Sequence, residues 1–180
     1  MSLDPLTGVF RLTDAIFQGR FPTPARFAAL KSLGITHFLN VSDAPNPDWV
    51  ASDCTIESDH VPIDDLVSLS DESLITAVNL LHQFVSAKDS RVYVHCIAGQ
   101  NRSPTVVWLY LCGCGIDPLH AKQVIESVNP DGVPGSGFLI DKRQQDLVVE
   151  YGKSRFLPHP RPGALTPVLN ANLQTGISNR

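Results

Sequence analysis

At three places along the chain, a capping residue followed at once by proline stands directly before a stretch with helical patterning. The pairs are Thr23-Pro24, Ser103-Pro104 and Asp117-Pro118. They suit a helix N-terminus because the side-chain oxygen accepts from a free amide and proline needs no hydrogen-bonded N–H. Short apolar runs at 35–41 and 91–95 have the length of buried strands. Strands alternating with helices predict a single α/β domain, with a central, mostly parallel, twisted sheet flanked by helices on both faces.

Three further helix signals and one more strand follow from the same rules. Gly34 marks the end of the first helix, and Ser70 caps a long amphipathic helix. Ser136 is expected to cap a last helix that ends near Gly152. Residues 60–63 (HVPI) fit a short strand.

The C-terminal segment differs from the rest in composition. Residues 154–180 contain four prolines and no acidic residue, and no periodicity is sustained there. We therefore expect a folded domain over 1–153 and an irregular, proline-containing tail over 154–180. The tail residues expected to pack are Phe156, Leu157 and Leu165.

Charge and hydropathy exclude several classes of protein. A net charge of -4 gives no support to a nucleic-acid binder or to a basic patch on acidic lipid. The longest apolar stretch, 105–116, is too short to span a membrane and is interrupted by glycine. The first residues lack the basic start and apolar run of a secretory signal, and the cysteines form no dense framework. We expect a cytoplasmic protein without a membrane span or a nucleic-acid partner.

The segment VYVHCIAGQNRSPT joins an apolar strand to a helix through a short loop. The amides of such a loop, with the positive end of the helix, form a cradle for an anion. Gly99 lets the backbone approach a phosphate closely, and Arg102 offers a planar fork of donors to two phosphate oxygens. The residues expected to bind the substrate phosphate are Ile97, Ala98, Gly99, Gln100, Asn101 and Arg102.

Cys96 lies at the mouth of this cradle. The groups that hold a phosphate also stabilise a thiolate, and a thiolate facing phosphorus can attack it in line. Ser103 can donate a hydrogen bond to the sulfur, which eases its departure when water cleaves a phosphocysteine. His95 precedes the nucleophile and is expected to orient the loop by hydrogen bonding. The set predicts a phosphate monoester hydrolase that works through a phosphocysteine intermediate.

Each of these residues also has an ordinary structural interpretation. A lone cysteine at a strand end is usually part of the core, and a lone arginine is usually solvated. Ser103 suits a helix N-cap, and His95 suits a buried position. The combination His-Cys-x5-Arg-Ser, with glycine in the loop and a strand and a helix on either side, is much harder to obtain by chance. The combination therefore favours catalysis.

HCIAGQNRS resembles the signature loop of the protein tyrosine phosphatase superfamily, and specifically that of the compact dual-specificity phosphatases. The resemblance extends over about residues 9–150. IFQGRFPTPARFAALKSLGITHFLNVSD is similar to that family's opening strand, helix and second strand, and VPIDD is similar to its acid-bearing loop. It implies a cysteine-dependent phosphatase with no cofactor.

A leaving oxygen needs a proton, which a carboxylic acid near the loop usually supplies. The resemblance implies the second acidic residue of VPIDD, so Asp65 is favoured over Asp64. Asp71 fits the first turn of the following helix better than the acid's place. Asp43 follows the strand at 35–41 and is a weaker candidate, because SDAPNP is also an ordinary turn.

Three departures from the family's pattern affect what the resemblance implies. Gly135 stands where the family often has an asparagine that supports the active-site loop, so support is expected from elsewhere. Asn101 before the arginine also occurs in the superfamily's RNA 5′-triphosphatases, which typically lack the aspartate acid. Loop residues 97–101 are uncharged, whereas members acting on inositol phospholipids often carry lysines there. A singly phosphorylated group is therefore the expected substrate.

Three functions stay open from the sequence. The first is hydrolysis of phosphorylated protein side chains, phosphotyrosine foremost, with phosphoserine and phosphothreonine as further substrates. The second is the same chemistry on a lipid phosphate, a nucleotide or an RNA end. The third is a phosphate-binding module without turnover, which loss of the cysteine, arginine or acid would indicate, although all three are present. The expected partner is a phosphorylated protein or a small phosphate monoester.

Two expectations concern cysteines and metals. Low-pKa cysteines are prone to oxidation, and Cys54 is a weak candidate to protect Cys96 as a disulfide. The favoured interpretation of Cys54 is a small side chain near a strand. No metal-ligand spacing is present in the sequence, so we expect neither a metal nor a cofactor.

Overall fold

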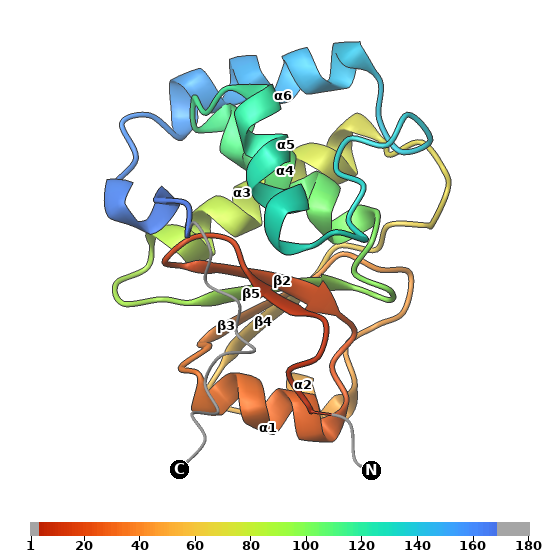
Figure 1. Ribbon diagram of the computed structural model, residues 1–180, viewed down its shortest axis with the longest axis vertical. Helices are drawn as coiled ribbons and strands as arrows, with labels where there is room; N and C mark the ends of the chain where they lie inside the picture. The colour runs from red at the N-terminus through yellow and green to blue at the C-terminus, as the bar shows by residue number, and fades with distance from the viewer. Residues whose placement is uncertain (1–3, 169–180) are drawn as a thin grey trace.

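The computed structural model describes residues 4–168. Its centre is a five-stranded sheet in the order β1-β2-β5-β3-β4 (Figure 1). The strands are β1 (Val9–Arg11), β2 (Ile16–Arg20), β3 (His37–Asn40), β4 (Glu57–His60) and β5 (Val92–Cys96). Among these five strands the β1–β2 pair is antiparallel, and the other three pairings are parallel. The predicted α/β fold with a mostly parallel sheet is confirmed.

Helices cover both faces of the sheet, as Figure 1 shows. Two short helices, α1 (Pro24–Ser32) and α2 (Asp48–Ala51), lie on one face. The other face carries α3 (Asp71–Ser86), α4 (Arg102–Gly113), α5 (Pro118–Val128) and α6 (Lys142–Arg155). A 3-10 turn, η1, follows at Pro162–Leu165.

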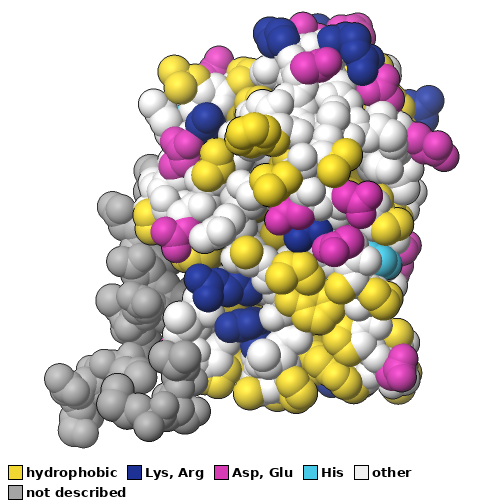
Figure 2. Space-filling model, turned by 90° about the vertical axis from the view of Figure 1, so that its right-hand side faces the viewer, with side chains coloured by type: hydrophobic (Ala, Val, Ile, Leu, Met, Phe, Trp, Pro, Cys, Tyr) yellow, Lys and Arg dark blue, Asp and Glu magenta, His cyan; other side chains and the backbone are white. Residues whose placement is uncertain are grey.

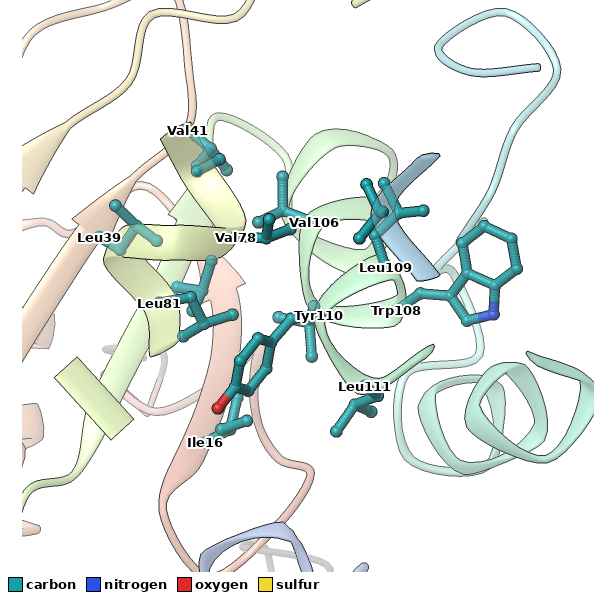
Figure 3. Close-up of a cluster of buried hydrophobic side chains, with 14 of the residues drawn as sticks. Ile16, Leu39, Val41, Val78, Leu81, Val106, Trp108, Leu109, Tyr110 and Leu111 are labelled. Atoms are coloured by element: carbon teal, nitrogen blue, oxygen red, sulfur yellow. The ribbon is translucent and has the colours of Figure 1, made fainter. Parts of the chain in front are cut away.

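Helix α4 is buried over its whole length, because it packs against the sheet, α3, α5 and α6 at once. Figure 3 shows Val106 and Tyr110 of α4 facing Val78 and Leu81 of α3, whereas Trp108 points to the opposite side. A separate core on the far face joins Phe27 and Leu30 of α1 to the sheet. A helix held on all sides fixes the position of the loop that precedes it.

Several predicted helix starts are confirmed by cap geometry. The side chains of Thr23, Ser70 and Asp117 each accept a hydrogen bond from the amide three residues ahead. Gly34 follows α1 with a φ of 81°, a conformation that suits glycine. The run at 91–95 is a strand, β5, shifted by one residue to Val92–Cys96.

Three predicted element limits are wrong. Ser103 is not an N-cap, because α4 already begins at Arg102 and Asn101 precedes it. Ser136 does not start the last helix; it forms a separate turn, and Asp141 caps α6 in a capping box with Gln144. The strand predicted at 60–63 is displaced, since β4 is the charged run Glu57–His60 and shares only His60 with the prediction. An edge strand tolerates such charges, which hides it from an apolar pattern.

The described part of the C-terminal segment packs on the helical layer. Helix α6 continues to Arg155, past the expected end near Gly152. Phe156 is fully buried and Leu165 is partly buried against the core, whereas Leu157 is 41% exposed. The guanidinium of Arg161 donates to the carbonyls of Val85 and Ala87 at the C-terminal end of α3. The prediction of an irregular tail over 169–180 lies outside the described residues.

Candidate active site

The site lies at the carboxyl ends of the parallel strands, where β5 runs into α4. Cys96 is the last residue of β5 and Arg102 the first of α4, so residues 97–101 form the connecting loop. Gly99 has a φ of 74°, and a Cβ there would lie 2.8 Å from the carbonyl carbon of Gly19. Only glycine suits both this backbone conformation and this close approach.

The loop presents its amides and ties its carbonyls to the rest of the protein. The carbonyl of Ile97 accepts from the amide of Phe21, and that of Gln100 accepts from Val133. Within the described part of the chain, four loop amides have no acceptor: those of Ile97, Ala98, Gln100 and Asn101. Together with the free first-turn amides of α4, these groups form an anion-binding concavity.

The Sγ of Cys96 lies inside this concavity. The amide of Gly99 donates to it at 3.3 Å, and the Ser103 hydroxyl lies 3.4 Å away. These donors and the N-terminus of α4 favour a negatively charged sulfur. The predicted contact between Ser103 and the sulfur is present. Ser103 is the second residue of α4, and from this position its side chain faces the site.

Arg102 is 3% exposed and is held in place by groups of two other segments. Its Nη1 donates to the Oδ1 of Asp43 at 2.6 Å and to the carbonyl of Ile63 at 2.8 Å. Its Nε is buried without a hydrogen-bond partner among the described residues, and the nearest acidic oxygen, from Asp65, is 3.6 Å away. A buried guanidinium N–H without an acceptor is suited to a phosphate oxygen.

Asp43, the weaker candidate for the general acid, is bound to the guanidinium of Arg102. The hydrogen bond from Arg102 lowers the pKa of Asp43, which disfavours the protonated form that a proton donor needs. An ionised carboxylate has no proton to give to a leaving group. The structure therefore favours holding Arg102 in position, over proton donation, as the role of Asp43.

The other three candidates for the general acid differ in the groups that their carboxylates contact. Asp65 turns its Oδ1 toward Arg102, across the mouth of the loop. Asp64 instead lines a shallow hollow of about 210 Å³ between this segment and the start of α3. Asp71 is the first residue of α3, and both its carboxylate oxygens accept from the guanidinium of Arg143. This geometry favours Asp65 as the proton donor.

His95 is fully buried, and neither ring nitrogen has a hydrogen-bond partner among the described residues. Its ring stacks on Tyr93 at 5.6 Å and meets the edge of Phe21 at 5.3 Å. Burial lowers the pKa of His95 to about 3, so the imidazole is neutral. The predicted hydrogen bond to the loop is absent, and His95 contacts its surroundings by packing.

Two residues that sequence reasoning missed support the loop. Gln18 of β2 and Asn129 at the end of α5 both donate to the carbonyl of Gly99, at 2.9 and 3.0 Å. Gly135, where the family often has asparagine, instead donates its amide to the Thr105 hydroxyl. The support expected from elsewhere thus comes from Gln18 and Asn129. A polar residue inside the apolar strand IFQGR was the one available signal.

The predicted disulfide between Cys54 and Cys96 is incompatible with this fold. Cys54 lies before β4, at the amino ends of the parallel strands, whereas Cys96 lies at their carboxyl ends. The register places the start of β4 level with Val92, so the two cysteines differ by roughly 13 Å along the strands. A disulfide needs Cα atoms within about 7 Å.

Figure 2 looks at the edge of the molecule where the carboxyl ends of the strands meet. Acidic side chains gather around basic ones near its centre, with a hydrophobic patch and a basic group below. Three exposed apolar residues lie next to the site. Leu66 follows Asp65, Ile97 follows Cys96, and Val133 donates its amide to a loop carbonyl. Residues 4–168 hold no group of three or more metal-ligating side chains and no helix able to span a membrane.

Comparison with known families decides the class. The pattern of the family described as "Dual specificity phosphatase, catalytic domain" matches residues 16–138. The chain belongs to this family. It is therefore a cysteine-based phosphatase, and the predicted resemblance is confirmed.

The names of two similar proteins point to different kinds of substrate, a protein in one case and a lipid phosphate in the other. "Dual specificity protein phosphatase 14" of Mus musculus is 28% identical over 166 residues, which cover 89% of this chain and 79% of the relative. "Phosphatidylglycerophosphate phosphatase PTPMT1" of Arabidopsis thaliana is 30% identical over 147 residues. That match covers 78% of this chain but only 41% of the Arabidopsis protein.

A solved structure agrees with the architecture. A mouse putative dual specificity phosphatase, crystallised with zinc tungstate, superposes with a TM-score of 0.68 and 24% identity. The match covers 86% of this chain and 92% of the mouse chain. At this identity the likeness establishes the fold, and the two relatives leave the kind of phosphate substrate open.

Proposed function

We propose that this phosphatase hydrolyses phosphate monoesters on protein side chains, phosphotyrosine most readily, with Cys96 as nucleophile. The observation that carries the proposal is the loop itself: Cys96 Sγ lies among unpaired amides, 3.3 Å from the Gly99 amide, beside the buried guanidinium of Arg102. These donors complement a phosphoryl group whose charge is spread over three oxygens in the transition state.

The reaction proceeds in two displacements. In the first, the thiolate of Cys96 forms a bond to phosphorus as the ester P–O bond breaks, and Asp65 gives its proton to the leaving oxygen. In the second, water attacks the phosphocysteine, Asp65 takes a proton from that water, and the P–S bond breaks. Phosphate leaves and the thiolate is restored, stabilised by the Ser103 hydroxyl 3.4 Å away.

The surroundings of the loop support a protein substrate. Loop residues 97–101 carry no charge, and two acidic side chains, Asp43 and Asp65, contact Arg102 beside the loop. Such a rim repels a ligand with further phosphates and accepts a single phosphoryl group. The exposed apolar side chains of Leu66, Ile97 and Val133 suit contact with a phosphotyrosine ring and its neighbours.

A lipid phosphate is the second candidate, because the Arabidopsis relative is named for phosphatidylglycerophosphate. The chemistry at Cys96 would be unchanged, and the same apolar rim would meet acyl chains. The acidic charge beside the loop counts against an anionic membrane surface.

A substrate panel tests the choice. Phosphate release is measured from a phosphotyrosine peptide, its phosphoserine and phosphothreonine counterparts, and phosphatidylglycerophosphate in neutral detergent micelles, with Cys96→Ser as the blank. We expect the highest kcat/KM on phosphotyrosine peptide. A tenfold or greater preference for the lipid would replace the protein substrate, and tight phosphopeptide binding without hydrolysis by the wild type would indicate a binding module.

A further inference from the structure

The Gly99 carbonyl determines how two buried side-chain amides are oriented. It accepts from Gln18 Nε2 at 2.9 Å and from Asn129 Nδ2 at 3.0 Å. Because a carbonyl oxygen can only accept, both side chains must point their NH₂ groups toward it. The Nδ2 of Asn129 also donates to Gln18 Oε1 at 2.9 Å, which fixes the same orientation of Gln18 from its other side. Gln18 and Asn129 are 0% and 1% exposed, so water does not compete for these bonds.

The second N–H of Gln18 reaches the Ser103 hydroxyl. Nε2 lies 2.9 Å from Ser103 Oγ, and with its orientation fixed it can only donate there. A hydroxyl that accepts from Gln18 keeps its own single hydrogen for another acceptor. The two acceptors within reach are Cys96 Sγ at 3.4 Å and the Gly19 carbonyl at 3.5 Å. Of the two, a sulfur that carries negative charge is the stronger acceptor.

We propose that Gln18 is a positioning residue for the second chemical step, acting through the direction of the Ser103 O–H; this inference rests on the proposed role of Cys96. When water cleaves the phosphocysteine, the P–S bond breaks and its electron pair stays on Sγ. A hydroxyl already directed at Sγ stabilises that charge without reorienting. The strand sequence IFQGR places this amide between the loop and the helix, where an aliphatic residue would leave the hydroxyl free to rotate.

The test replaces the amide by an aliphatic side chain of similar length, Gln18→Met. Rapid mixing with nitrophenyl phosphate resolves the burst, which reports phosphocysteine formation, from the steady-state rate, which reports its hydrolysis once that step limits. We expect the steady-state rate to fall about threefold to tenfold, with a smaller change in burst rate, since the loss of one ordinary hydrogen bond has an effect of this size. In Ser103→Ala, adding Gln18→Met should change the steady-state rate little further.

A second readout needs no turnover and so stands apart from the proposed function. The rate of iodoacetamide alkylation at Cys96 is measured as a function of pH. The midpoint of this curve should lie at higher pH in Gln18→Met and in Ser103→Ala than in the wild type. The double variant should have the same midpoint as Ser103→Ala. Gln18→Leu, whose branched side chain is compatible with a strand, gives the same test if Gln18→Met does not fold.

Two controls separate positioning from general support. Gln144→Met removes the other buried glutamine, which bonds the Leu69 carbonyl, and should lower stability while leaving the alkylation profile at that of the wild type. Asn129→Leu removes one donor to the Gly99 carbonyl and one of the two contacts that orient Gln18, but it keeps the bond from Gln18 to Ser103. It should therefore slow phosphocysteine hydrolysis less than Gln18→Met does. A wild-type alkylation profile and burst in folded Gln18→Met, or effects that add to those of Ser103→Ala, would overturn the inference. Failure of wild type to form phosphocysteine would refute the proposed function instead.

Discussion

Arg102 shows how neighbours prepare one side chain for its ligand. A free arginine has many rotamers and would lose that freedom on binding phosphate. Here Asp43 and the Ile63 carbonyl already hold Nη1, at 2.6 and 2.8 Å, while Nε stays without a partner among the described residues. Arg102 thus loses its rotamer freedom during folding and not on binding, and its other guanidinium N–H groups are available to the phosphoryl group. Neither partner of Nη1 could be identified from the sequence, because they come from segments 39 and 59 residues away.

The assignment of the general acid is tested by two adjacent substitutions. Asp65→Asn should lower kcat on an aryl phosphate with a poor leaving group by about 100-fold or more, since a lost proton donor has an effect of this size. On nitrophenyl phosphate, whose leaving group needs little protonation, the loss should be much smaller. Asp64→Asn is the matched control and should retain most of the activity on both substrates. The reverse result would assign the acid to Asp64.

The buried imidazole of His95 should make the protein less stable in acid. Its pKa is about 3 in the folded protein and about 6.5 in the unfolded chain, so between these values the unfolded state binds the extra proton. Stability therefore falls as pH drops below about 6.5. From pH 7.5 to 5.5 the free energy of unfolding should fall by about 1 kcal/mol more in wild type than in His95→Gln.

Urea unfolding at the two pH values measures this difference. Because His82 and His159 also have a lowered pKa from burial, both proteins should lose some stability in acid, and only the difference between them reports His95. Equal losses in the two proteins would mean that His95 is charged or solvated in the folded state.

At the scale of elements, local signals predicted helices well and side-chain direction poorly. Thr23 and Asp117 cap α1 and α5 as expected, since a cap depends only on residues three positions away. Ser103 has the same sequence context, but its hydroxyl turns to Cys96 and Gln18, which are close only in the folded sheet. The edge strand β4 was missed for a related reason, because its stability comes from pairing with β3 and not from apolar burial.

Helices α4 and α6 meet at glycines, and this contact predicts a large effect of one methyl group. A Cβ on Gly152 would lie 2.5 Å from the carbonyl carbon and Cα of Gly113. Gly152→Ala must therefore push the two helices apart, and overpacking of this kind costs about 1–3 kcal/mol. Thermal unfolding should show a clear loss of stability.

Gly137→Ala provides the matched control, since a Cβ at Gly137 would meet nothing within 4 Å. It should keep the thermal midpoint of the wild type or raise it slightly, because alanine restricts the unfolded chain. If Gly152→Ala were as stable as Gly137→Ala, the close packing of α4 on α6 would be wrong.

Over the whole molecule, charge is distributed unevenly along the chain. Residues 32–87 contain no lysine or arginine. The acidic residues in this stretch are Asp43, Asp48, Asp53, Glu57, Asp59, Asp64, Asp65, Asp71 and Glu72. The stretch comprises β3, α2, β4, the segment carrying Asp65 and helix α3, so it forms one side of the molecule next to the active site. We therefore expect this side to attract peptide substrates with basic neighbours.

Peptide substrates with opposite charges test this field. A phosphotyrosine peptide flanked by lysine and arginine should have a kcat/KM several-fold higher than the same peptide flanked by glutamate, through faster encounter. The difference should shrink as salt rises from 0.05 to 0.5 M, because screening shortens the range of the attraction to a few ångströms. Equal rates at low salt would show that the acidic side does not steer substrate.

The role of Cys96 is tested most directly by measuring nitrophenyl phosphate hydrolysis in the presence of EDTA. The assay compares the wild type with Cys96→Ser and with Cys54→Ser, which changes an exposed cysteine. The account predicts full activity in wild type and Cys54→Ser, with a loss of at least about a thousandfold in Cys96→Ser, because a serine hydroxyl here has no base to activate it. Activity that persists in Cys96→Ser, or that EDTA removes from the wild type, would contradict a metal-free phosphocysteine mechanism.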